Sequence, residues 1–153
     1  MSNYAIYKLK YGYFRIEQED GAVVSLRCLL EKPTEMGTPT TLTDTAANQL
    51  TEYFDGKRKA FDFSYRLHGT EFQKKVWAEL EKIPYGETRT YGQIAAAVEN
   101  PKASRAIGMA NNRNPNTIAV PCHRVIGTDG SLTGYAGGLP MKESILKMEQ
   151  QNS

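Results

Sequence analysis

The residues best suited to chemistry gather in one stretch, residues 118–127, where Cys122 stands directly before His123 and behind Pro121. A thiolate is a strong nucleophile, but a thiol with a pKa of about 8.5 is only a few per cent ionised at neutral pH. A reactive cysteine therefore needs a cation, a base or helix N–H groups beside it, and His123 is a candidate base. The competing interpretation is a buried structural thiol that fills the core.

Adjacent residues of a straight strand point to opposite faces, so Cys122 and His123 cannot meet directly on a regular strand. Either the backbone turns at Pro121, or a water molecule bridges the imidazole and the sulfur. A third group must also orient the histidine, as in other pairs of nucleophile and base. Glu143 and Glu149, on the last predicted helix, are the candidates for that group.

The composition is typical of a globular protein that forms a core without covalent staples. The chain has 153 residues, 40% hydrophobic and 24% charged, which fits one domain or two small ones. Its two cysteines and two histidines lack metal-ligand spacing, so we expect neither a metal site nor a disulfide framework. A free thiol survives in a reducing cytoplasm, which is the location we expect. No signal peptide and no apolar run of about 18 residues is present, which argues against a membrane partner.

The first 68 residues predict a small α/β domain, a β-meander plus a helix, with a structural role. Residues 4–9, 12–18 and 22–30 are rich in strand-forming residues, and Asp20-Gly21 is a hairpin signal. Residues 42–55 have apolar side chains at helical spacing, and Gly56 follows. Residues 61–65 alternate as a strand does. We expect Cys28 to be a buried apolar filler.

Residues 69–153 predict a winged helix-turn-helix domain, which makes the whole an α+β two-domain fold. Capping boxes begin helices at Thr70 and Thr90, and Asn100 with Pro101 predicts the start of a third. The last two are the outline of a helix-turn-helix, with residues 102–111 as recognition helix. A strand over 117–126, a hairpin turn at Asp129-Gly130 and a helix from Pro140 complete the domain.

Positive charge gathers next to the Cys-His pair. Residues 100–126 contain no acidic residue but four basic ones: Lys102, Arg105, Arg113 and Arg124. An acid-free basic stretch that leads into a reactive site indicates a polyanionic partner, whereas a solvated surface is the other interpretation.

The residues around the cysteine resemble those of the methylated-DNA–protein-cysteine methyltransferases, which repair O6-alkylguanine in DNA. The active-site motif of that family, Pro-Cys-His-Arg-Val, stands at residues 121–125. The flanking motifs of the family also match, in chain order, at residues 104–108, at Asn114-Pro115 and in the glycine loop 135–139. The resemblance covers residues 70–149, whereas the first 68 residues resemble the variable N-terminal domain only in outline.

The resemblance implies a transfer reaction that consumes the protein. Cys122 would take the alkyl group from guanine irreversibly, without a metal or cofactor. His123 would act through a water as its base, with Glu149 holding the imidazole. Asn114 would brace the active-site turn, and the hydroxyl of Tyr91 would serve the leaving guanine oxygen.

The same resemblance implies a set of substrate and DNA contacts. The carbonyls of Cys122 and Val125 would read the guanine amino group, the N–H of Ala136 would contact O6, and Tyr135 lies in the same loop. Arg105 would enter the base stack while the damaged nucleotide is flipped out. The partner is double-stranded DNA, bound in the minor groove by a monomer. Lys102, Arg113 and Arg124 join these contacts, the first two at phosphates.

Some positions depart from the family pattern and leave alternatives open. Ala136 replaces a common serine, and Asn111-Asn112 stand where some members have methionine and arginine, so the range of adducts, O4-methylthymine included, and any cooperativity on DNA stay open. A winged-helix transcription factor would explain the helix pair but not the Pro-Cys-His-Arg motif. A cysteine hydrolase would use Cys122 and His123 but would turn over.

Overall fold

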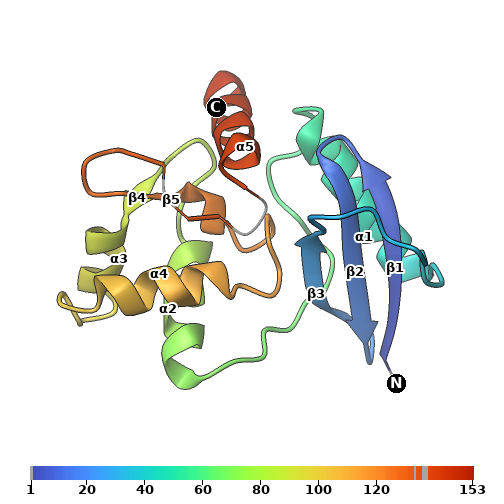
Figure 1. Cartoon of the computed structure of the whole chain (residues 1–153), viewed down its shortest axis with the longest axis horizontal. Helices are drawn as coiled ribbons and strands as arrows, with labels where there is room; N and C mark the ends of the chain where they lie inside the picture. Colours follow the sequence, from blue (N-terminus) through green and yellow to red (C-terminus); the bar gives the residue numbers. More distant parts are fainter. Residues whose placement is uncertain (1, 133, 136–137) are drawn as a thin grey trace.

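The computed structural model describes residues 2–132, 134–135 and 138–153. In Figure 1 the N-terminal sheet and a group of helices from the second half of the chain lie on opposite sides of the molecule. The sheet is an antiparallel meander of β1 (Ser2–Leu9), β2 (Gly12–Glu19) and β3 (Ala22–Cys28), as predicted. Asp20 and Gly21 both have positive φ, 49° and 80°, which fits the tight turn expected there.

Helix α1 (Thr41–Phe54) covers this sheet. Thr40 begins it with a capping box, and its buried stripe of Ala46, Leu50 and Tyr53 packs on Phe14 of β2. The strand predicted over 61–65 is wrong. The segment alternates in burial, but it makes only one bridge to the sheet, from Tyr65 to Val23.

The second half contains α2 (Glu71–Glu81), α3 (Tyr91–Ala97) and α4 (Ser104–Asn112). The capping boxes predicted at Thr70 and Thr90 are both present. The start predicted for the next helix at Asn100 is wrong, since α4 begins at Ser104. Asn100 instead closes α3: Glu99 has φ 61°, and the Asn100 N–H donates to Ala95 O at 2.9 Å, a helix-ending motif.

The regular strand predicted over 117–126 is also wrong. Ile118 has φ 73°, residues Cys122–Arg124 form the one-turn helix η1, and only β5 (Val125–Ile126) is a strand. It pairs in parallel with β4 (Arg89–Thr90). Gly127 N–H donates to Ser131 O at 2.8 Å across the predicted turn at Asp129-Gly130, but this turn joins no antiparallel hairpin within the described residues.

Two hydrophobic clusters correspond broadly to the two predicted domains. One contains the sheet and α1; the other lies among α2, α3, α4 and η1. Helix α5 (Leu139–Asn152), with Pro140 in its first turn, crosses this division: Met141 and Ile145 pack in the first cluster, as does Ile118. The boundary at residues 68 and 69 therefore stays a prediction. No helix in the described part of the chain is both long and apolar enough to cross a membrane.

Candidate active site

Cys122 occupies the first position of the one-turn helix η1, directly after Pro121. Of the two arrangements that the sequence left open, a turn at Pro121 is therefore present. The Cys122 N–H donates to Val120 O at 2.8 Å, so the chain doubles back just before the sulfur. The turn removes the straight-strand geometry that would have separated the cysteine from the histidine.

Asn114 holds this turn together. Its Nδ2 donates to Val120 O at 2.7 Å, and its Oδ1 accepts the N–H of Asn116 at 3.0 Å. Asn111 adds a bond from Nδ2 to Cys122 O at 3.3 Å. Both asparagines are buried, so these bonds do not compete with bulk water. The bracing role expected for Asn114 agrees with this geometry, whereas Asn111 was missed as a second brace.

The surroundings of Cys122 favour the protonated thiol over the thiolate. The side chain is only 2% exposed, and burial raises its pKa to about 11, although a hydrogen bond from Asn114 and the charge of Lys142 act in the opposite direction. Lys142 is itself fully buried, with Nζ 2.5 Å from Val125 O, and burial lowers its pKa to about 8. Nucleophilic chemistry at this sulfur would therefore first require loss of its proton.

His123 is fixed in one orientation by Glu149. The His123 Nε2 lies 2.8 Å from Glu149 Oε2, and both side chains are fully buried. A carboxylate accepts hydrogen bonds only, so the imidazole proton is on Nε2. Burial lowers the pKa of His123 and outweighs the opposite effect of Glu149, so the ring is neutral at rest. Its Nδ1 has no hydrogen-bond partner among the described residues and is free to accept a proton.

Arg124 lies in the interior, which contradicts its expected place among the DNA contacts. Its Nε and Nη2 each donate to Glu149 at 2.8 Å, and its Nη1 donates to Ile83 O at 2.8 Å. Burial alone would raise the pKa of Glu149, but the hydrogen bonds from His123 and Arg124 hold it well below its usual range. Glu149 thus stays ionised. Its alternative, Glu143, is exposed and pairs with Lys147 at 3.4 Å.

Sequence reasoning also missed Tyr53. This residue belongs to α1, yet its hydroxyl donates to Glu149 Oε2 and lies 3.2 Å from His123 Nε2. Its place in the apolar stripe of α1 gave no signal beyond core packing.

The residues predicted to contact DNA phosphates or the base stack lie on one exposed region around α4. Arg105 is in its first turn, Lys102 just before it and Arg113 at its end, and all three are exposed. Tyr91 lies beside this helix: a Cβ added at Gly108 would lie 3.9 Å from its ring, and one at Gly134 would lie 3.6 Å from its hydroxyl oxygen. The predicted contact at Ala136 lies outside the described residues.

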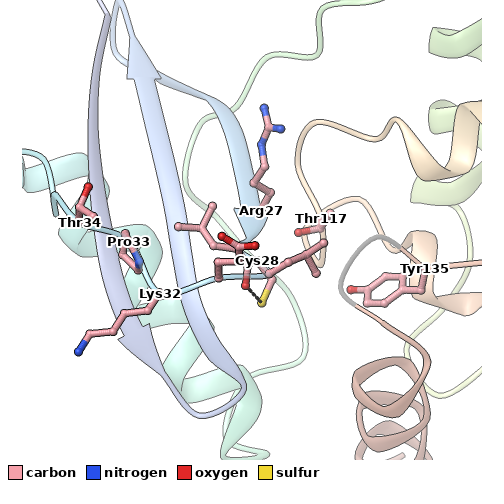
Figure 2. Close-up of a pocket in the computed structure, with 10 residues that line it drawn as sticks. Arg27, Cys28, Lys32, Pro33, Thr34, Thr117 and Tyr135 are labelled. Carbon is pink, nitrogen blue, oxygen red and sulfur yellow. Dashed lines mark hydrogen bonds between the residues drawn. The ribbon is translucent and has the colours of Figure 1, made fainter.

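A pocket of about 650 Å³ opens between the end of β3 and Tyr135 (Figure 2). Thr117 and Cys28 also line it, and Cys28 is half-buried rather than the buried filler expected. Burial raises the pKa of Tyr135 well above its usual value, and the thiols of Cys122 and Cys28 raise it further. Tyr135 therefore lies between the pocket and the reactive turn.

Comparison with known proteins identifies the family of this chain. Residues 71–151 match the family described as "6-O-methylguanine DNA methyltransferase, DNA binding domain". The methylated-DNA–protein-cysteine methyltransferase of Methanosarcina mazei is 62% identical over 106 residues, which are 69% of this chain and 67% of that protein. This chain belongs to the methylated-DNA–protein-cysteine methyltransferase family. A member from Mycolicibacterium paratuberculosis is 53% identical over 108 residues, which are 71% of this chain and 66% of that protein.

Solved structures of family members extend the similarity to the N-terminal half. The Mycobacterium tuberculosis O6-methylguanine methyltransferase has a TM-score of 0.90 and 39% identity, covering 100% of this chain and 95% of that one. The same organism's OGT in complex with DNA has a TM-score of 0.88 and 41% identity, covering 98% and 94%. The α+β two-domain class predicted from the sequence is thus confirmed for this family member.

Proposed function

We propose that this chain repairs DNA by moving an alkyl group from O6 of guanine to the sulfur of Cys122, once per molecule. One observation carries the proposal: a buried thiol shares the one-turn helix η1 with the next residue, His123, whose Nε2 is held by Glu149 and whose Nδ1 is unpaired among the described residues. That arrangement fits a base that acts only when a substrate is in place. Relatives named methylated-DNA–protein-cysteine methyltransferase support it.

The reaction begins with removal of the thiol proton. His123 Nδ1 accepts it through a water molecule, and the charge of Glu149 stabilises the imidazolium that forms. The sulfur lone pair then attacks the alkyl carbon, and the bond from carbon to O6 breaks in line. The electron pair stays on O6, where the hydroxyl of Tyr91 supplies a hydrogen bond or proton. The product is a thioether, which no nearby group reverses.

A base inside a duplex is out of reach of a buried sulfur, so the damaged nucleotide must be flipped out. Arg105, exposed in the first turn of α4, fills the gap in the stack. Lys102 and Arg113, exposed on either side, contact phosphates, with α4 in the minor groove. The solved DNA complex of the Mycobacterium tuberculosis relative supports DNA as the partner.

The flipped guanine is read by backbone groups of the reactive turn and the loop beside it. The carbonyls of Cys122 and Val125 would read the guanine amino group. Cys122 O already accepts from Asn111 and from the Val125 N–H, so it would exchange one of these partners for the substrate, and Val125 O accepts from Lys142. Tyr135 borders the base, and the N–H of Ala136 contacts O6. The protein acts as a monomer in the cytoplasm, with residues 1–68 as a structural domain.

Intact-protein mass spectrometry tests the proposal. The protein is mixed with duplex oligonucleotide that contains one O6-methylguanine. We expect one added methyl group on Cys122, in equal amount to the guanine restored, and none in Cys122→Ala. Tight binding without a mass change would instead indicate a pure DNA-binding module. Many turnovers per molecule would indicate a cysteine hydrolase.

A further inference from the structure

The side chain of Tyr53 links the N-terminal half of the chain to His123 and Glu149. We propose that Tyr53 is a positioning residue for the alkyl transfer, whose hydroxyl holds the carboxylate of Glu149 and the ring of His123 in their working arrangement. This inference rests on the proposed function. It assigns part of the active-site machinery to a domain that was expected to be structural only.

The geometry of the hydroxyl supports this role. Tyr53 is fully buried near the C-terminal end of α1. Its hydroxyl donates to Glu149 Oε2 and lies 3.2 Å from His123 Nε2, which itself lies 2.8 Å from the same Oε2. Tyrosine, histidine and carboxylate therefore form a closed triangle of polar contacts, and displacement of one member disturbs both others.

The ring of Tyr53 cannot easily leave this position. Its centroid lies 5.3 Å from that of Phe61 and 6.2 Å from that of Tyr85, both in tilted or edge contacts, and 5.7 Å from that of the neighbouring Phe54. Aromatic packing on several sides leaves the ring one orientation. The hydroxyl is thus a fixed donor rather than a mobile one.

The direction of the hydrogen bond follows from the charges. Burial raises the pKa of Tyr53 well above 10, and the charge of Glu149 raises it further, so the phenol keeps its proton. The carboxylate is ionised and can only accept. Glu149 Oε2 therefore receives hydrogen bonds from Tyr53, His123 and Arg124 together.

Loss of one donor changes how strongly the carboxylate attracts the imidazole proton. With Tyr53 in place, its phenol neutralises part of the negative charge on Glu149 Oε2, so the carboxylate stabilises the His123 imidazolium less than it would without that hydroxyl. Removal of the hydroxyl concentrates that charge on His123 and raises its pKa. Because the base must be neutral to accept a proton, the transfer rate would then start to fall at a higher pH.

The test compares Tyr53→Phe with Tyr7→Phe. Tyr7 is a matched control: its hydroxyl also donates to a carboxylate, Asp44 at 2.6 Å, but this bond joins β1 to α1 and involves neither His123 nor Glu149. Each substitution keeps the ring and removes one oxygen. Single-turnover transfer from O6-methylguanine in duplex DNA is measured from pH 5 to pH 9, together with the melting temperature.

We expect Tyr53→Phe to transfer about tenfold more slowly near neutral pH, with the acidic limb of the profile about half a unit or more higher. Tyr7→Phe should keep the wild-type transfer rate and pH profile, even if its melting temperature falls by as much as that of Tyr53→Phe. An unchanged profile in Tyr53→Phe, or equal slowing in both variants, would overturn the inference. Failure of the wild-type protein to transfer methyl at all would instead refute the proposed function.

A measurement on the wild-type protein covers the case in which Tyr53→Phe does not fold. The hydroxyl proton of Tyr53, sealed from solvent, should give a resolved NMR signal with a nuclear Overhauser effect to the ring of His123. Rapid exchange of that proton with water, or no such effect, would also overturn the inference.

Discussion

Glu149→Gln is the sharpest perturbation of the reactive centre, because it removes a charge and keeps the shape of the side chain. Glu149 is fully buried and accepts hydrogen bonds from Tyr53, His123 and Arg124, and from the Gly86 N–H at 3.3 Å. A glutamine amide has one oxygen to offer instead of two. The guanidinium of Arg124, of which only 9% of the side chain is exposed, would be left without its counter-charge.

The size of the effect follows from this burial. Removal of one partner of a buried ion pair costs about 3–5 kcal/mol, because the other charge stays desolvated and unpaired. In a chain of this length that corresponds to a fall in melting temperature of about 10 °C. The transfer rate should fall about a hundredfold or more, because His123 loses the group that fixes its proton on Nε2.

The stability lost in Glu149→Gln should depend on pH in a direction that the pKa of Glu149 fixes. The pKa of Glu149 is lower in the folded protein than the value of about 4.3 in an unfolded chain. Its contribution to stability is therefore complete above pH 5 and is lost as the pH falls below 4 toward the folded value. The difference in unfolding free energy between wild type and Glu149→Gln should shrink over that range.

Glu143→Gln is the matched control, since Glu143 lies on the same helix, is 57% exposed and pairs with Lys147 at 3.4 Å. Urea unfolding of both variants at pH 7 and pH 3.5 measures the costs, and the control should change by at most about 0.5 kcal/mol. If Glu149→Gln were no less stable than Glu143→Gln at pH 7, the buried network would not stabilise the fold and the reasoning would fail.

Two further substitutions separate thiol chemistry from DNA binding. Lys142→Met removes a charge that lowers the pKa of Cys122. Alkylation of that thiol by iodoacetamide at pH 8, followed by peptide mass mapping, should therefore be about threefold slower or more. An unchanged rate would mean that Lys142 does not act on the sulfur. Arg105→Ala, at an exposed position, should leave the melting temperature and the rate of transfer from free O6-methylguanine unchanged, but should lose most repair in duplex DNA. Equal loss on both substrates would argue against a role in flipping.

Local signals in the sequence predicted most of the fold. The capping boxes at Thr70 and Thr90 and the turn at Asp20-Gly21 depend on residues within four positions of each other, and all three are present. The start predicted at Asn100 was wrong although the pattern was reasonable. The same residue suits the end of one helix as well as the start of another, and the left-handed conformation of Glu99 decided between them.

Contacts between distant residues were beyond the sequence patterns. Asn114 bonds to Val120 O to make the turn before Cys122, which no strand propensity anticipates. Arg124 was placed with the DNA contacts because its charge matched its neighbours, but charge alone does not say which way a side chain faces. Tyr53 meets Glu149 across 96 positions of sequence, and the helical periodicity that placed it in the core could not show that partner.

Burial of the sulfur makes the reaction selective as well as slow to start. With a pKa of about 11, the fraction of Cys122 present as thiolate at pH 7 is on the order of one in ten thousand. Ordinary electrophiles, which react with the thiolate, therefore meet an almost inert thiol. A protein that acts once would be lost to every such side reaction if the sulfur were permanently ionised. On the proposed mechanism, His123 would remove the proton only when an alkylated base is aligned, which would avoid that loss. This would give a reason for the combination of a buried thiol with a fixed neutral base, in place of a lone thiolate beside exposed cations.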